Sequence, residues 1–256
     1  MKTLFLKVIY KILKIFFKNY KSNYNNHKIY YKLDSTFGKQ IFLKNYHESV
    51  ELKKAKRFIK QNSIVIDIGA HVGLFSLIYS QYCKKGFVLS LEPNLDLFDL
   101  IIKNIFLNNV KNIIPISLGA DKKNEILKFN ITKDPAYSSI IKNNRNIILK
   151  NKNIFVINLY TLLKNLKYKI DFIKIDTEGN EFSIVNSLHK IIKKHRPVFQ
   201  IEIINNHEFN KFKLFFLKEN YELQIIKNNK LIRKNLSKYK FNRKIYNHFF
   251  SCIKKK

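Results

Sequence analysis

The stretch Ser63–Ser76, SIVIDIGAHVGLFS, decides the fold of this chain. Its first part, Ile64–Ile66, is a short β-branched run, which is typical of a strand that is buried on both faces. Gly69 and Gly73 follow Asp67, and the apolar residues after them take up helical spacing. The segment therefore predicts a strand, a glycine turn and a helix. In such a unit, backbone N–H groups at the start of the helix can meet a bound ligand.

The chemistry of this turn indicates which ligand it could bind. Its G-x-x-x-G spacing departs from the G-x-G-x-x-G pattern of dinucleotide sites. Asp67 at the strand end would repel a pyrophosphate, whereas its carboxylate would attract the ammonium and sulfonium groups of S-adenosylmethionine. We therefore expect S-adenosylmethionine as the cofactor, bound by Asp67, Gly69, Ala70 and Gly73. The alternative is an ordinary turn in which Asp67 only caps the helix.

Two later segments place acids at comparable positions. Glu92 follows the apolar run Phe87–Leu91, where an acid after the second strand of such a unit accepts hydrogen bonds from ribose hydroxyls. The segment Asp171–Glu181 has the sequence DFIKIDTEGNE. Together the three segments resemble the FkbM family of S-adenosylmethionine-dependent methyltransferases. The motifs of that family, D-x-G-A-x-x-G-x-F-S, E-P-N and K-I-D-x-E-G-x-E, occur here in that order, and the resemblance covers roughly residues 48–204.

The resemblance implies a fold, a reaction and an acceptor. The fold is the α/β class I methyltransferase (Rossmann-like) fold, a doubly wound, mostly parallel sheet, here with an inserted hairpin and basic N- and C-terminal extensions. The reaction is O-methyl transfer from S-adenosylmethionine to a hydroxyl of a sugar, glycan or glycolipid, as in polysaccharide biosynthesis. We divide the chain into a basic amphipathic helix and lead-in at residues 1–45, a methyltransferase domain at 46–234 and a basic tail at 235–256.

Several acids lie where the strands of the predicted sheet should end, and ligands bind there in open α/β sheets. Asp176 and Glu178 are the candidate catalytic residues, because a sugar hydroxyl is barely acidic and a base must take its proton. Alternatively, Asp176, Glu178 and Glu202 could bind a divalent cation such as Mg²⁺ that acidifies the hydroxyl. A purely structural role for Asp176 is to cap the helix that follows. Further candidates for cofactor binding are Asn94, Ser117, Leu118 and Asp121.

A polar segment, Thr132–Asn153, separates two expected strands at Glu125–Asn130 and Ile154–Asn158. The resemblance suggests that these strands form an inserted hairpin, with a loop that covers the substrate pocket. Tyr137 and its neighbours in that loop could contact an acceptor.

The composition limits which other functional classes the chain could belong to. The net charge is +31, from 49 Lys and Arg against 18 Asp and Glu, and an AT-rich genome would produce such a bias without selection on charge. The chain has no Pro-Pro or Pro-Cys pair of the kind that base-methylating enzymes use. These observations argue against a nucleic acid partner. The alternatives are an RNA ribose 2′-O-methyltransferase and a non-catalytic membrane-associated protein on a methyltransferase fold. The chain has only two cysteines, Cys83 and Cys252, with no metal-like pairing of them, which favours a reducing, cytoplasmic compartment.

The first twenty residues carry Lys7, Lys11, Lys14 and Lys18 on one helical stripe, with apolar residues at most other positions. The lysines interrupt every apolar run that a secretory signal or a membrane-spanning helix would need. Two interpretations stay open. The helix either lies on an anionic membrane surface, such as the inner membrane face, or packs on the domain with its lysines in water.

Overall fold

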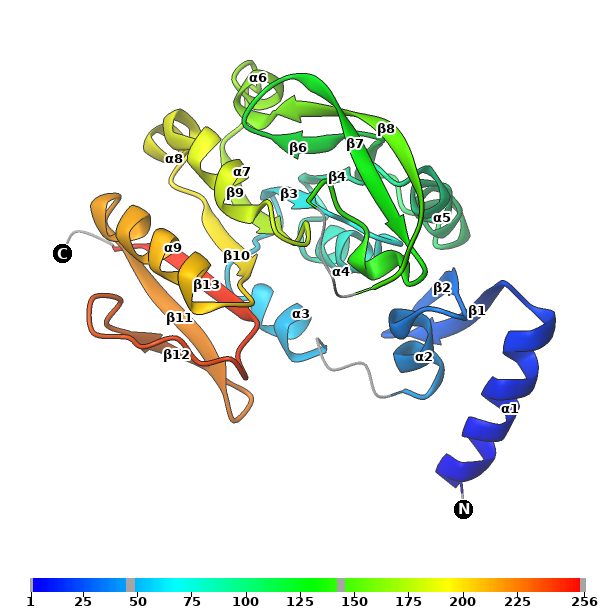
Figure 1. Ribbon diagram of the computed structural model, residues 1–256. Helices are drawn as coiled ribbons and strands as arrows, with labels where there is room; N and C mark the ends of the chain where they lie inside the picture. The colour runs from blue at the N-terminus through cyan, green and yellow to red at the C-terminus, as the bar shows by residue number, and fades with distance from the viewer. Residues whose placement is uncertain (1, 45–48, 142–145, 254–256) are drawn as a thin grey trace.

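A computed structural model describes residues 2–44, 49–141 and 146–253 of the chain (Figure 1). A central sheet is built from β3 (Ile64–Ile68), β4 (Phe87–Leu91), β5 (Ile113–Ile116), β9 (Ile170–Ile175), β10 (Val198–Glu202), β11 (Tyr221–Lys227), β12 (Lys230–Lys234) and β13 (Asn247–Cys252). The eight strands lie in the order β12-β11-β13-β10-β9-β3-β4-β5. The strands from β10 to β5 are parallel, and β11, β12 and β13 pair antiparallel. This topology confirms the predicted α/β fold with a doubly wound, mostly parallel sheet.

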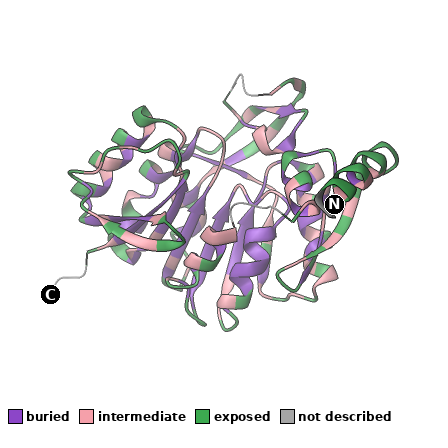
Figure 2. Ribbon diagram, turned by 90° about the horizontal axis from the view of Figure 1, so that it is seen from below, coloured by how far each residue is buried: buried purple, intermediate pink, exposed green. Residues whose placement is uncertain are grey.

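Helices cover both faces of the sheet, so its central strands are buried on both sides (Figure 2). On one face lie α6 (Leu159–Leu163), α7 (Glu181–Ser187), α8 (His189–His195) and α9 (Asn206–Lys218), and on the other α3 (Ser49–Ala55), α4 (Leu74–Tyr82) and α5 (Leu95–Leu107). Side chains alternate along β3, where Ile64, Ile66 and Ile68 belong to the first core and Val65 to the second. Each residue of β3 is buried, as its apolar sequence predicts.

Two smaller units flank the sheet. One consists of the hairpin β1 (Asn19–Tyr24) and β2 (His27–Lys32), followed by α2 (Thr36–Phe42), with the helix α1 (Lys2–Phe16) before it. The other is a three-stranded sheet of β6 (Gly119–Asp121), β8 (Ile148–Asn158) and β7 (Glu125–Thr132), in that order, with a short 3₁₀ helix at Pro135–Tyr137. The antiparallel β7–β8 pair is the expected inserted hairpin, and both strands are longer than the sequence suggested.

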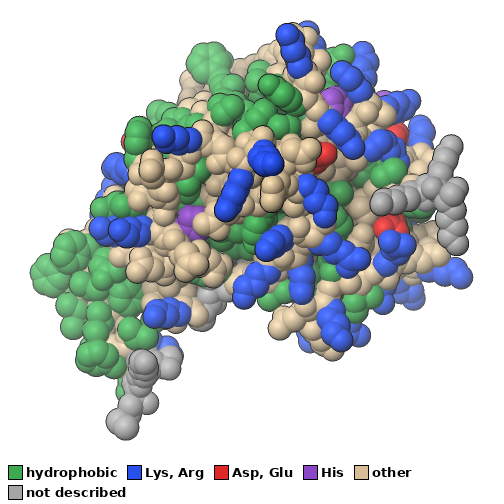
Figure 3. Space-filling view, turned by 180° about the vertical axis from the view of Figure 1, so that it is seen from behind, with side chains coloured by type: hydrophobic (Ala, Val, Ile, Leu, Met, Phe, Trp, Pro, Cys, Tyr) green, Lys and Arg blue, Asp and Glu red, His purple; other side chains and the backbone are tan. Residues whose placement is uncertain are grey.

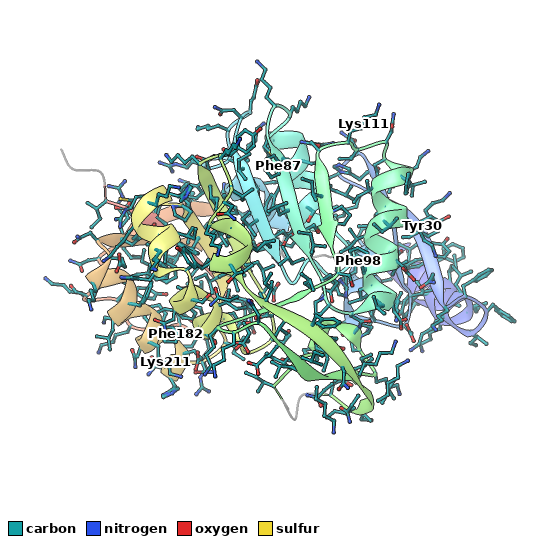
Figure 4. The ribbon with its side chains drawn as sticks, turned by 90° about the horizontal axis from the view of Figure 1, so that it is seen from above. Tyr30, Phe87, Phe98, Lys111, Phe182 and Lys211 are labelled. Atoms are coloured by element: carbon teal, nitrogen blue, oxygen red, sulfur yellow. The ribbon has the colours of Figure 1, made fainter. Side chains whose placement is uncertain are left out.

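Polar contacts join the first hairpin to the core, and a cation–aromatic contact joins two helices on one face of the sheet. Asn104 of α5 accepts a hydrogen bond from the Tyr30 backbone N–H at 2.6 Å and donates to the Tyr30 carbonyl at 3.0 Å. Tyr30 accordingly lies beside α5 in Figure 4. The same view shows Phe182 of α7 and Lys211 of α9 side by side, with the Lys211 ammonium 5.9 Å from the Phe182 ring centroid. The first hairpin is thus anchored to the same domain and is more than a lead-in.

The end of the chain corrects the expected domain division. Residues 235–256 were expected to form a basic tail, yet Asn247–Cys252 form β13 inside the sheet, between β10 and β11. Phe250 is fully buried and stacks on Phe216, with ring centroids 4.1 Å apart. The domain therefore does not end at residue 234. The other expected boundary, between residues 45 and 46, lies outside the described residues.

We predict that a chain ending at Tyr246 will fail to fold cooperatively. Removing β13 separates β10 from β11 and exposes their backbone hydrogen-bonding groups and the Phe250 pocket. Thermal unfolding followed by circular dichroism should show no cooperative transition. A chain ending at Ile253 is the matched control and should melt like the full-length protein. A sharp transition in both would mean that the segment after residue 246 is dispensable.

Candidate active site

Backbone hydrogen bonds connect the segments at the carboxyl ends of β3, β4 and β9. The N–H groups of Gly69 and Ala70 both donate to the Leu91 carbonyl at 3.0 Å, and the Asp176 N–H donates to the Ile68 carbonyl at 3.1 Å. Gly69 has a φ of +73°, and a Cβ there would lie 1.8 Å from the Asp176 carbonyl oxygen. Only glycine fits this crossing of two chain segments.

A cavity of about 530 Å³ opens at this edge of the sheet, which is where ligands bind in open α/β folds. Of the residues predicted from the sequence, those lining it are Gly69, Ala70, Glu92, Leu118, Asp176, Glu178 and Glu202. The predicted residues that do not line it are Asp67, Gly73, Asn94, Ser117 and Asp121. The sequence therefore predicted Glu92, Asp176, Glu178 and Glu202 at the cavity, whereas Glu51 of α3, which also lines it, was not predicted.

Asp67 lies beneath the cavity and is paired with a buried lysine. Its carboxylate is fully buried, accepts a hydrogen bond from the Ser76 hydroxyl at 2.6 Å and lies 3.5 Å from the Lys174 ammonium. The same ammonium lies 3.2 Å from the Asp176 carboxylate and donates to the Gly69 carbonyl at 3.3 Å. Lys174 thus neutralises Asp67, which differs from our expectation of a carboxylate that attracts the cofactor directly.

Glu92, after β4, binds the backbone of the glycine turn that follows β3. One of its oxygens accepts the His71 backbone N–H at 2.9 Å, and the other accepts the Asn94 N–H at 2.9 Å. Burial raises the pKa of Glu92 to about 7, although these two N–H groups act to lower it. Each carboxylate oxygen has two lone pairs, so both can accept a further hydrogen bond from a ligand.

Buried polar atoms near the cavity lack partners among the described residues. The His71 Nε2 and the Asn94 Nδ2 are buried and make no hydrogen bond within the described parts of the chain. Burial lowers the pKa of His71 to about 4, so its ring is neutral at physiological pH. The Asn94 Oδ1 accepts the Asp96 N–H at 3.2 Å and so caps α5.

The remaining cofactor candidates have structural contacts of their own. The Asp121 carboxylate accepts hydrogen bonds from the Ser183 hydroxyl at 2.7 Å and from the Lys122 N–H at 2.6 Å. Gly73 has a φ of +81° and precedes the first turn of α4. Leu118 reaches the cavity, while its neighbour Ser117 does not.

The three acids proposed as base or metal ligands lie together at the cavity wall. One oxygen each from Asp176, Glu178 and Glu202 can be chosen so that all lie within 4.8 Å of one another, and each residue is half-buried. Glu178 has a φ of +60°, a conformation that non-glycine residues rarely adopt. This turn therefore places the Glu178 side chain at some backbone cost.

Glu181, not Asp176, caps the turn that leads into α7. Its carboxylate accepts hydrogen bonds from the backbone N–H groups of Thr177 at 2.8 Å and Gly179 at 3.0 Å. The Asp176 carboxylate instead pairs with Lys174 and lines the cavity. Asp176 therefore does not have the helix-cap role weighed for it, and the N-cap residue of α7, Asn180, makes no side-chain cap hydrogen bond.

The loop between β7 and β8 borders the cavity, as the sequence suggested. Pro135, Tyr137 and Ser138 line it. The Ser139 hydroxyl donates to the Glu178 carbonyl at 3.0 Å, which ties the loop to the acidic turn. Residues 142–145 of this loop lie outside the described chain.

Sequence reasoning overlooked Lys174, although a signal was present. A lysine within the apolar run Ile170–Ile175 of a strand buried on both faces needs a buried partner. Lys174 is directly opposite Asp67 in the β3–β9 register. Its ammonium also lies 4.7 Å from the Phe75 ring centroid, in a cation–π contact.

The cavity has the size and chemistry that a nucleoside-containing cofactor requires. Its volume is within the usual range for small-molecule sites. Glu92 offers unused acceptor capacity for hydroxyls, and apolar side chains of Leu118, Phe129 and Val156 provide a surface for a flat ring. These residues fit S-adenosylmethionine.

The chain belongs to the FkbM methyltransferase family, because the Methyltransferase FkbM domain model matches residues 67–242. A tRNA(Phe) (4-demethylwyosine(37)-C(7)) aminocarboxypropyltransferase from Methanocaldococcus jannaschii is 27% identical over 157 residues. The match covers 58% of this chain and 61% of that relative, so the chain spans about three fifths of its length.

Two solved structures share the fold. The M. jannaschii TYW2 structure in complex with AdoMet has a TM-score of 0.51 at 14% identity, covering 92% of this chain and 87% of that one. The FkbM methyltransferase from Methylobacillus flagellatus has a TM-score of 0.51 at 15% identity, covering 75% of this chain and 44% of that one. The predicted family and fold are therefore both confirmed.

The tRNA-modifying relative corrects two sequence-based predictions. O-methylation of a sugar, glycan or glycolipid is wrong, because that relative transfers an aminocarboxypropyl group to tRNA(Phe). The expectation of a sugar or glycan partner in place of a nucleic acid is wrong for the same reason. Nothing in that similarity supports transfer to a ribose 2′-hydroxyl or a non-catalytic role.

We predict that Lys174→Met will destabilise the protein by about 3–5 kcal/mol, because it leaves the Asp67 carboxylate buried without its counter-charge. Lys32→Met is the matched control. It removes a 3.3 Å ion pair with Asp96, whose side chain is 43% exposed, and should cost less than about 1 kcal/mol. Denaturant unfolding measures both. Equal losses would contradict a central role for the buried pair.

Proposed function

We propose that this protein is an S-adenosylmethionine-dependent transferase that modifies a nucleotide of tRNA. The observation that carries the proposal is the 27% identity over 157 residues to a tRNA-modifying enzyme. That match covers part of each chain, so the substrate is inferred from similarity of the transferase region. The acid-lined cavity at the carboxyl edge of the sheet supports a transfer reaction at this position.

The cofactor is S-adenosylmethionine, in line with the complex with AdoMet of the M. jannaschii neighbour. When bound, it supplies an electrophilic carbon next to a positively charged sulfur. We assign Glu92 to its ribose hydroxyls and the Gly69–Ala70 turn to its amino acid part. The carboxylates of the cavity complement its positive charge. Leu118 and the apolar wall beside it would pack against the adenine.

Asp176 and Glu178 are the groups that we assign to the acceptor. An acceptor atom that carries a hydrogen, such as an exocyclic amino nitrogen or a ring carbon of a base, must lose a proton when the new bond forms, and a carboxylate within reach can take it. Lys174 fixes the Asp176 carboxylate through their 3.2 Å ion pair, so its position at the cavity wall is set before an acceptor enters. A divalent cation held by Asp176, Glu178 and Glu202 is the alternative means of acidifying the acceptor.

The charge of the chain fits a polyanionic substrate. Its net charge is +31, and on the face that Figure 3 shows, lysine and arginine side chains are spread widely while acidic side chains are few. Near the site, Lys32, Lys150 and Lys152 are close enough to Asp96 to lower its pKa against the effect of partial burial, which raises it. These lysines can contact phosphates while a base enters the cavity.

The family and the tRNA-modifying relative suggest different transferred groups. Membership of the FkbM family favours a methyl group, which makes methyl transfer our first candidate. The relative favours an aminocarboxypropyl group as the second candidate. Both reactions use the same cofactor and differ in which carbon next to the sulfonium is attacked.

One labelling experiment tests the proposal and separates the two groups. The full-length protein is incubated with tRNA from a strain lacking this gene and with S-adenosylmethionine labelled in either the methyl or the carboxyl carbon. We expect methyl label in the tRNA. Transfer of carboxyl label would identify aminocarboxypropyl transfer, and no transfer of either label would contradict tRNA modification.

Asp176→Asn in the same assay tests the assigned base. The amide keeps the shape of the side chain but cannot take a proton, so turnover should fall about a hundredfold or more. Cofactor binding measured by calorimetry should survive. Asp121→Asn is the control, since Asp121 lies outside the cavity wall. Near-normal turnover of Asp176→Asn would exclude both the base and the metal-ligand role.

Cofactor affinity should depend on the protonation of Glu92. Because burial raises the pKa of Glu92 to about 7, the carboxylate gains a proton as the pH falls below that value and loses acceptor capacity. Calorimetry with S-adenosylhomocysteine should therefore show weaker binding at about pH 6 than at about pH 8. Glu92→Gln should bind weakly at both values, whereas the exposed control Glu125→Gln should behave like the native protein. Identical pH dependence in all three proteins would remove Glu92 from the site.

A further inference from the structure

The helix α1 stands out from the body of the molecule with little of its surface covered (Figure 1). Of the α1 side chains whose burial is described, only Tyr10 is buried, and its hydroxyl donates to the Leu33 carbonyl at 2.8 Å. Leu6, Ile9 and Leu13, on the same side as Tyr10, are half-buried. This narrow side attaches the helix to the domain.

A second face of α1 is apolar and open to solvent. Its exposed side chains, with exposed fractions, are Leu4 at 70%, Phe5 at 66%, Val8 at 50%, Ile12 at 50%, Ile15 at 78% and Phe16 at 73%. At 100° per residue these positions form one stripe, separate from the attached side. Figure 3 shows the resulting patch of hydrophobic side chains where α1 projects. The chain thus exposes an apolar helix face instead of burying it in the domain.

The lysine stripe forms a third face and borders a groove. Lys7, Lys11 and Lys14 line a groove of about 610 Å³ between α1 and α2, together with Lys39 of α2. No acidic side chain is among the residues that line it, and the sequence has no acid before Asp34. A cluster of positive charge therefore lies beside the exposed apolar stripe.

We propose that α1 binds the surface of an anionic lipid membrane, with its apolar stripe in the headgroup region and its lysine groove on lipid phosphates. The apolar stripe can enter the headgroup region of such a membrane, and the lysines of the groove can pair with its anionic phosphates. A second copy of the chain would match the apolar stripe but bring a like-charged lysine groove against this one. A polyanion such as tRNA would match the lysines but leave six apolar side chains in water.

The membrane contact is peripheral. No helix within the described residues is long and apolar enough to cross a bilayer. The proposal concerns a surface outside the cavity and does not depend on the proposed function.

Vesicle flotation with the full-length protein tests the proposal. The vesicles are phosphatidylcholine alone or phosphatidylcholine mixed with phosphatidylglycerol, at low and high salt. We expect binding only to the anionic vesicles, and less of it at high salt. Lys7→Gln/Lys11→Gln/Lys14→Gln should weaken binding on the order of a hundredfold at low salt. Phe5→Ser/Ile12→Ser/Phe16→Ser should weaken it at least about tenfold.

Matched controls change equally exposed residues elsewhere. Phe106→Ser/Phe155→Ser/Leu214→Ser removes apolar side chains that are 79%, 65% and 71% exposed, and Lys84→Gln/Lys111→Gln/Lys218→Gln removes three exposed lysines. Both control variants should float like the native protein. All variants change exposed side chains only, so their melting temperatures should match.

Three results would overturn the proposal. The first is that the full-length protein does not float with anionic vesicles. The second is that the α1 variants float as well as their controls. The third is that the α1 variants lose self-association in light scattering or lose tRNA binding while vesicle binding is unchanged, which would assign the surface to a second copy or to RNA. The tRNA labelling assay is run on the same variants, so a failure here is distinguishable from a failure of the proposed function.

Discussion

The site depends on one buried ammonium shared between two carboxylates. Lys174 lies 3.5 Å from Asp67 and 3.2 Å from Asp176, and both Lys174 and Asp67 are almost completely removed from solvent. Two carboxylates on neighbouring strands repel each other, and burying either one alone costs several kcal/mol. The ammonium removes both penalties. It therefore lets β3 and β9 lie side by side with acids at their ends, and it holds the Asp176 carboxylate at the cavity wall.

The protein combines an acidic cavity with a basic exterior. The cavity wall carries Glu51, Glu92, Asp176, Glu178 and Glu202, while the chain as a whole has a net charge of +31. In the proposed function, the acidic cavity and the basic exterior have different roles. The acids suit a cationic cofactor and take a proton from the acceptor, and the lysines outside hold the phosphates of the substrate. Salt should therefore weaken substrate binding much more than binding of the cofactor, which the cavity encloses.

Local patterns in the sequence predicted the parts of the fold that local forces determine. The apolar run Ile64–Ile66, the glycines after it and the alternation of strands and helices predicted the parallel sheet. The positions of acids at the strand ends predicted four of the acids that line the cavity, but not Glu51 of α3. Lys174 was missed because its partner Asp67 is more than a hundred residues away, and the pair becomes visible only in the β3–β9 register. The strand β13 was missed because it returns to the middle of the sheet from a segment whose lysines and aromatics look like a tail.

The acceptor could not be inferred from the motifs, because they describe how the cofactor is held and not what is modified. The high positive charge is the signal for a nucleic acid in this sequence, but a compositional bias produces the same charge, so the signal is ambiguous. For the helix α1, the structure adds what the sequence could not decide. The sequence left two orientations of the first helix open, and the structure places its lysines along a groove and its apolar stripe in solvent.

A crystal structure with S-adenosylhomocysteine tests the central claim most directly, namely that the cavity at the ends of β3, β4 and β9 is a cofactor site organised by Lys174. The account predicts ribose hydroxyls on Glu92, the amino acid part of the ligand at the Gly69–Ala70 turn, and Asp67 still paired with Lys174. A ligand bound elsewhere, or one that displaces Lys174 from Asp67 to reach that carboxylate, would contradict it.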